Sequence, residues 1–156
     1  MKNQARILVV DDNRSLVRIV EGILQRIGYE IITAYDGVEA LDQARLKKPD
    51  LIILDIVMPN MDGYEAARRL QSDPATARIP ILMLTVKGHV EEDPTPDTLR
   101  EWQGKVRERM AGFDAGAVEF MSKPVTAKEL VNKVKAVLWM NRVKGRRQGS
   151  DGQWVD

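Results

Sequence analysis

Residues 51–63 read LIILDIVMPNMDG, and they combine an apolar run, an acidic residue and a turn. The run Leu51–Leu54 is short and continuous, which is typical of a strand buried on both faces of a parallel sheet. It ends at Asp55, and Pro59 and Gly63 then indicate a turn before the next element. A buried strand that ends in a carboxylate predicts a polar site at the carboxyl edge of an α/β sheet.

Apolar strands and helical patterns alternate along the whole chain. The predicted strands are Arg6–Val10, Glu30–Ala34, Leu51–Leu54, Ile81–Leu84 and Val118–Met121. Apolar residues repeat at helical spacing in Ser15–Ile27, which Gly28 closes, in Val38–Lys47 and in Tyr64–Leu70. Thr126 and Glu129 form a capping box before a last helix, whose apolar face holds Leu130, Val134, Val137 and Leu138. This alternation predicts an α/β fold with a mostly parallel five-stranded sheet and helices on both faces.

Length and composition indicate one soluble domain. The chain has 156 residues, the size of a single core, and a formal net charge of +1 gives no overall attraction to nucleic acid or membrane. It contains no cysteine, which excludes disulfides, thiolate catalysis and cysteine metal sites. The apolar run Ile7–Val10 is too short for a signal peptide and ends in two aspartates. We expect a cytoplasmic location.

Polar residues follow four of the predicted strands. Asp11 and Asp12 follow the first strand, Asp55 the third, Thr85 the fourth and Lys123 the fifth. The carboxyl ends of parallel strands meet at one edge, so these groups converge. Two carboxylates about 4 Å apart repel by roughly 4 kcal/mol at an effective dielectric constant near 20. A bound cation or a raised pKa is therefore required, and Mg²⁺ suits an all-oxygen site that keeps waters.

This set of residues favours phosphoryl transfer to Asp55. A carboxylate can accept a phosphoryl group when the incoming charge is neutralised, here by Mg²⁺ and Lys123. Thr85 would donate its hydroxyl to a phosphoryl oxygen and draw the end of its strand inward, which predicts a switch.

Four motifs in order resemble the receiver domain of two-component response regulators, the CheY-like superfamily. They are Val9-Val10-Asp11-Asp12-Asn13, Leu54-Asp55-Ile56-Val57-Met58-Pro59-Asn60-Met61-Asp62-Gly63, Leu84-Thr85 and Ser122-Lys123-Pro124. The resemblance runs from about Ile7 to Val143 and implies a flavodoxin-like, doubly wound sheet in the strand order 2-1-3-4-5.

The resemblance also implies roles for individual residues. Asp12 and Asp55 would ligate Mg²⁺ directly, Asp11 through a water and Val57 through its backbone carbonyl, with Mn²⁺ as a substitute metal.

Three further residues take their implied roles from the same resemblance. Lys123 and Pro124 would be joined by a cis peptide that aims the lysine. Phe120 would be the aromatic side chain that moves together with Thr85 as part of the switch. Simple core packing is the alternative for Phe120.

The segment after the fourth strand is longer than in the family. We expect an insertion at about residues 87–104 that enlarges the region before and within the fourth helix, with a helix over Thr98–Met110. Trp102 on this helix either packs on the sheet or anchors a partner. The receiver domain would cover residues 1–144, and 145–156 would be a disordered tail.

The predicted function is a phosphorylation-dependent signalling switch, not an enzyme beyond self-catalysed phosphorylation and dephosphorylation. A sensor histidine kinase or phosphotransfer protein would supply the phosphoryl group, and a downstream protein or a second copy would bind the altered face. No specific nucleic-acid or membrane binding is expected. The alternatives are a pseudo-receiver that acts without phosphorylation and the receiver part of a longer DNA-binding regulator. A phosphatase of the haloacid-dehalogenase type is disfavoured, because Asp55-Ile56-Val57 lacks that family's second aspartate.

Overall fold

The computed structural model describes residues 4–85, 100–101, 104, 108, 118–123, 125–145, 147–148 and 154–155. The sheet strands are β1 (Arg6–Val10), β2 (Glu30–Ala34), β3 (Leu51–Asp55), β4 (Ile81–Thr85) and β5 (Val118–Ser122). The helices are α1 (Arg14–Gln25), α2 (Gly37–Lys47), α3 (Gly63–Ser72) and α5 (Ala127–Gly145). All five predicted strands are confirmed, and the last three extend one residue further than predicted.

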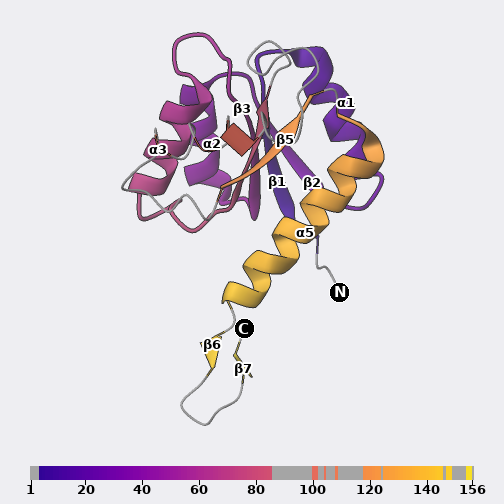
Figure 1. The fold of residues 1–156 in the computed structure, drawn as a ribbon, viewed down its shortest axis with the longest axis vertical. Helices are drawn as coiled ribbons and strands as arrows, with labels where there is room; N and C mark the ends of the chain where they lie inside the picture. Colours follow the sequence, from indigo (N-terminus) through magenta and orange to yellow (C-terminus); the bar gives the residue numbers. More distant parts are fainter. Residues whose placement is uncertain are drawn as a thin grey trace.

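The five strands form one parallel sheet in the order β2-β1-β3-β4-β5 (Figure 1). This arrangement confirms the flavodoxin-like order that the resemblance implied. Because β1 and β3 are neighbours in the middle of the sheet, their carboxyl ends lie side by side, and β4 and β5 continue the same edge. The order therefore brings the predicted polar groups to one place.

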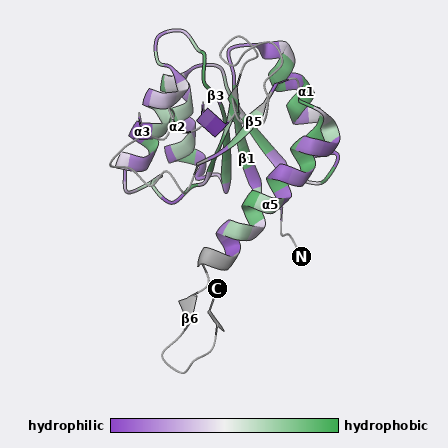
Figure 2. Cartoon of the chain, in the orientation of Figure 1, coloured by the Kyte–Doolittle hydropathy of each residue, from purple (hydrophilic) through white to green (hydrophobic). Residues whose placement is uncertain are grey.

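Helices cover the sheet on two faces, and the core is correspondingly divided in two. α2 and α3 lie on one face, and α1 and α5 lie on the other (Figure 1). Successive strand residues point to opposite faces, so Ile52 and Leu54 pack with α2 and α3, whereas Leu51 and Ile53 pack with α1 and α5. Figure 2 shows the hydrophobic strands enclosed between helices whose outer faces are largely hydrophilic.

A polar side chain caps the start of each of the helices α1, α2, α3 and α5. Asn13 accepts the Leu16 N–H at 3.2 Å, Asp36 accepts the Glu39 N–H at 2.8 Å, and Asp62 accepts the Glu65 N–H at 2.9 Å. Thr126 accepts the Glu129 N–H at 3.2 Å, as the capping box predicted.

Three helices differ in extent from their predictions, and α2 begins one residue earlier than the predicted Val38–Lys47. α1 begins one residue earlier than predicted and ends at Gln25, because the Ile27 and Gly28 N–H groups bond three residues back and tighten the last turn. Gly28 takes a positive φ of 106°, as predicted for the residue that closes this helix. α3 extends the predicted Tyr64–Leu70 by one residue at its start and two at its end.

Several predictions fall on segments beyond the described residues. Trp102, Pro124 and most of the predicted insertion at 87–104 lie outside them. Within the predicted helix Thr98–Met110, the structure describes four residues, and all four are helical: Arg100, Glu101, Gly104 and Glu108. Within the expected tail, β6 (Arg147–Gln148) pairs antiparallel with β7 (Trp154–Val155). The domain bounds and the disordered tail stay predictions. Among the described residues, no helix is long and apolar enough to cross a membrane.

Candidate functional site

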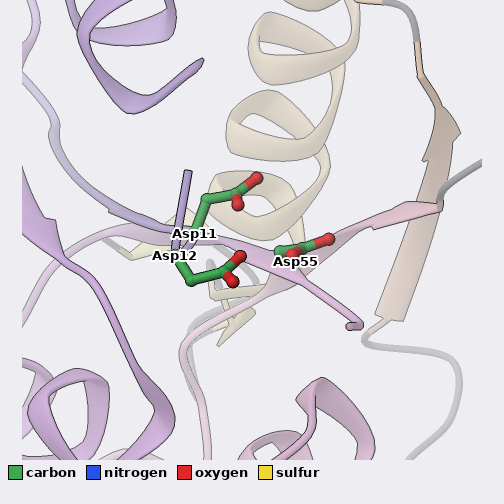
Figure 3. Close-up of side chains that lie close together, drawn as sticks. All are labelled: Asp11, Asp12 and Asp55. Atoms are coloured by element: carbon green, nitrogen blue, oxygen red, sulfur yellow. The ribbon is translucent and has the colours of Figure 1, made fainter. Parts of the chain in front are cut away.

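Three carboxylates meet at the carboxyl edge of the sheet. Asp11 and Asp12 follow β1, and Asp55 is the last residue of β3. One carboxylate oxygen from each lies within 4.8 Å of the others, and Figure 3 shows the three side chains close together at this edge. The parallel pairing of Val10 with Leu54 places the residues that follow them at the same level, which explains why these aspartates meet.

Lys123 reaches into this carboxylate cluster from the end of β5. Its Nζ donates to Asp11 Oδ2 at 2.8 Å and to Asp55 Oδ1 at 3.2 Å. The lysine side chain is 19% exposed, whereas those of Asp11 and Asp55 are 1% and 2% exposed. These are ion pairs at partly buried positions, where loss of one partner leaves an uncompensated charge.

The backbone fixes Asp11, whereas Asp12 is open to solvent. The Asp11 backbone N–H donates to the Ala34 carbonyl at 3.2 Å, and its Oδ1 accepts the Asn13 N–H at 2.9 Å. Asp12 is exposed. The carboxylate cluster therefore has a buried side formed by Asp11, Asp55 and Lys123 and an accessible side formed by Asp12.

The buried carboxylate of Asp55 is perturbed. The pKa of Asp55 is raised from 3.8 to about 6, mainly by burial and next by the neighbouring Asp11 charge, while Lys123 opposes both. Burial alone acts to lower the pKa of Lys123, but its hydrogen bonds and the charges of Asp11 and Asp55 outweigh burial and raise it. Lys123 is thus held as a cation beside a carboxylate that resists ionisation.

This arrangement suits a hard divalent cation. With all three carboxylates ionised, the single ammonium would leave two uncompensated negative charges, and the possible ligand atoms of the carboxylates are all oxygens. Mg²⁺ is usually bound by one or two carboxylates together with waters and substrate phosphate oxygens. The residues present fit the predicted metal.

The other predicted site residues lie near the same edge, with their roles still predictions. Thr85 ends β4 and pairs in register with Ser122, next to Lys123, and its side chain is outside the described part of the chain. Val57 lies in the loop after β3 and is 43% exposed. Phe120 is 6% exposed and belongs to the core on the α2 and α3 face. The predicted cis peptide between Lys123 and Pro124 extends outside the described residues.

Sequence reasoning missed two tertiary contacts. The Arg14 guanidinium lies 3.9 Å from the centre of the Tyr35 ring, and Gly37 approaches Met61 closely. Each pair joins residues far apart in the sequence, so no local pattern marks them.

Comparison with known proteins identifies a matching family and several related sequences. A family model described as "Response regulator receiver domain" matches residues 7–96. The alkaline phosphatase synthesis transcriptional regulatory protein PhoP of Bacillus subtilis is 40% identical over 133 residues, covering 85% of this chain and 48% of PhoP. The chain spans about half the length of the curated relatives it matches.

Two solved structures match this chain over most of its length and over nearly all of their own. A putative response regulator from Chloroflexus aurantiacus is 35% identical with a TM-score of 0.69, covering 88% of this chain and 99% of that one. The chemotaxis protein CheY4 of Vibrio cholerae is 31% identical with a TM-score of 0.67, covering 86% and 98% respectively. The similarity thus extends over nearly the whole length of each of these two solved chains.

Proposed function

The chain belongs to the response regulator receiver domain family, and we propose that it is a signalling switch that accepts a phosphoryl group on Asp55. Receiver domains are signalling domains rather than classical enzymes. The observation that carries this proposal is the buried Asp55 carboxylate at the carboxyl edge of the sheet, which accepts a hydrogen bond from the same Lys123 ammonium that binds Asp11.

We propose that Mg²⁺ is held by Asp11, Asp12, Asp55 and the backbone carbonyl of Val57, with Mn²⁺ as a substitute. The clustered carboxylate oxygens support this assignment. When bound, the metal ion supplies positive charge for the incoming phosphoryl oxygens. Burial and the Asp11 charge raise the pKa of Asp55, and a cation at this site would favour the ionised carboxylate that the reaction needs.

In the proposed reaction, a carboxylate oxygen of Asp55 attacks the donor phosphorus. A new phosphorus–oxygen bond forms while the bond from phosphorus to the donor breaks, and the donor keeps the bonding electron pair. Lys123, already within 3.2 Å of Asp55 Oδ1, is the fixed cation that stabilises the added negative charge. Thr85 at the end of β4 would bind a phosphoryl oxygen, and Phe120 would move with it.

The proposed partners follow from the family. A sensor histidine kinase or phosphotransfer protein in the cytoplasm would supply the phosphoryl group. A downstream protein or a second copy of the chain would bind the face altered by phosphorylation. The exposed Asp12 supports donor access from the solvent side of the site.

A second candidate is that the chain forms the receiver part of a longer DNA-binding regulator. It is favoured by the partial coverage of the curated relatives, several of which are named as transcriptional regulators. The same phosphoryl-transfer chemistry would then control a further domain. A pseudo-receiver that acts without phosphorylation is the remaining alternative.

The experiment that tests the proposal is intact mass spectrometry after incubation with acetyl phosphate. We expect a covalent adduct of one phosphoryl group when Mg²⁺ is present and none after chelation with EDTA. Asp62→Asn serves as a matched control, because Asp62 caps α3 and has no proposed role in phosphoryl transfer. If wild-type protein stays unmodified after incubation with acetyl phosphate and also after incubation with a phosphorylated kinase domain, the pseudo-receiver is favoured instead.

A further inference from the structure

The loop between β3 and α3, residues 56–62, is held on two sides by positions that have no room for a side chain. We propose that Gly37 and Gly63 are positioning residues for the proposed metal site, because their missing Cβ atoms let this loop lie where Asp55 and Val57 can bind a metal ion. The inference rests on the proposed function and adds two residues to it.

Gly63 packs directly on the backbone that follows the phosphoacceptor. Its N–H donates to the Ile56 carbonyl at 2.7 Å and closes the loop. A Cβ at Gly63 would lie 2.7 Å from Ile56 Cα and closer still to the Asp55 carbonyl oxygen. Both contacts are backbone atoms, which cannot rotate away, so any side chain at Gly63 must displace the peptide between Asp55 and Ile56.

Gly37 supports the same loop from the first turn of α2. A Cβ there would lie 2.8 Å from Met61 Cβ and 2.9 Å from its Cγ and Sδ. Met61 is 9% exposed, and its N–H donates to the Pro59 carbonyl at 2.8 Å. A side chain at Gly37 would therefore push on the loop through Met61.

The helices on both sides cannot easily yield to relieve these contacts. Asp36 caps α2 and Asp62 caps α3 through hydrogen bonds of 2.8 and 2.9 Å, and both helices pack on the core. On the strand side, the Ile56 N–H donates to the Leu84 carbonyl at 3.3 Å and ties the start of the loop to β4. The displacement must then occur within the loop itself.

A shift of this loop would change the arrangement of the proposed metal ligands without changing the charge of any of them. The loop begins at the Asp55 peptide and carries Val57, so both proposed ligands would move relative to Asp11 and Asp12. Groups that orient metal ligands typically change metal affinity by about 10- to 100-fold when they are altered. The expected signature is weaker Mg²⁺ binding by protein that is still folded.

The test compares Gly63→Ala and Gly37→Ala with Gly22→Ala, a control on α1 where a Cβ meets nothing within 4 Å. Isothermal titration calorimetry without phosphodonor measures the Mg²⁺ dissociation constant, and calorimetric unfolding in EDTA measures metal-free stability. We expect the Mg²⁺ dissociation constant to rise by about 10-fold for Gly37→Ala and by up to about 100-fold for Gly63→Ala. Gly22→Ala should keep the wild-type Mg²⁺ dissociation constant, although alanine within a helix raises its stability.

A purely structural role would lower the unfolding temperature in EDTA and leave the Mg²⁺ dissociation constant of the folded protein unchanged, which overturns the inference. If Gly63→Ala does not fold, Gly37→Ala decides the question, because its close contacts are with side-chain atoms of Met61 rather than with backbone atoms. Wild-type protein that binds Mg²⁺ yet accepts no phosphoryl group would overturn the proposed function and leave this inference standing.

Discussion

Asp55 combines two demands that oppose each other. Its carboxylate is buried beside Asp11, which raises its pKa to about 6, yet it must ionise to attack phosphorus. Lys123 moderates the conflict, and a metal ion would remove it. The sequence motifs predicted which residues meet here. They could not predict how deeply Asp55 and Asp11 are buried, and that burial is the main cause of the raised pKa.

The raised pKa of Asp55 predicts a pH-dependent penalty on metal-free stability. Between the unfolded pKa of 3.8 and the folded pKa of about 6, the native state binds more protons than the unfolded state. The stability contributed by protonated Asp55 is therefore complete below 3.8 and is lost as the pH rises through about 6. Asp55→Asn, which cannot ionise, should gain stability over wild type by on the order of 2–3 kcal/mol above that range.

Urea unfolding in EDTA, below and above this pH window, measures that gain. The result that contradicts the prediction is a difference between Asp55→Asn and wild type that stays constant with pH.

Lys123→Met should impair phosphoryl transfer. The substitution keeps the apolar stem but removes the ammonium that contacts Asp11 and Asp55, so charge added at Asp55 is less well stabilised. We expect the initial rate of adduct formation from acetyl phosphate at saturating Mg²⁺ to fall by on the order of 10²-fold. Lys128→Met, at an exposed position on α5, is the matched control. Equal rates for the two variants would remove Lys123 from the mechanism.

Helix starts follow a repeated local signal in this chain. Asp36 with Glu39, Asp62 with Glu65 and Thr126 with Glu129 share the same three-residue spacing, and each first residue caps its helix. Only the third pair was used to predict a helix start. The first two pairs would have corrected the predicted starts of α2 and α3 by one residue, because the capping signal lies in adjacent sequence and needs no tertiary information.

Thr126→Ala should destabilise the protein by about 1 kcal/mol through loss of the α5 cap. The Glu129 N–H would lose its 3.2 Å hydrogen bond to the Thr126 hydroxyl. Thr126→Ser keeps a hydroxyl and should lie close to wild type. Urea denaturation midpoints at constant m-value measure both variants. If serine and alanine destabilise equally, the lost methyl group rather than the cap explains the effect.

The whole molecule is organised around strands that are buried on both faces. The continuous apolar runs of β1 and β3 predicted this burial, and all five sheet strands were located from sequence. The strand order came only from resemblance, because alternating strands and helices are compatible with several parallel orders. Contacts such as Gly37 with Met61 could not be predicted, since they arise only after α2 and α3 pack side by side.

Two leucine substitutions test this division between core and surface. Leu54 in β3 is fully buried, whereas Leu46 on α2 is 75% exposed. Leu54→Ala should reduce the free energy of unfolding by about 2–5 kcal/mol, and Leu46→Ala by less than about 0.5 kcal/mol. Urea unfolding at neutral pH measures both. A large loss for Leu46→Ala would indicate that this exposed face is covered in solution.

The central claim is that Asp55 itself carries the phosphoryl group, and chemical mapping of the modified residue tests it most directly. Protein incubated with acetyl phosphate and Mg²⁺ is treated with borohydride, which reduces an aspartyl phosphate to homoserine, and the digested peptides are sequenced by mass spectrometry. We predict homoserine at position 55 and unchanged aspartate at positions 11, 12 and 62. Homoserine at one of those other positions, with aspartate intact at 55, would contradict the account.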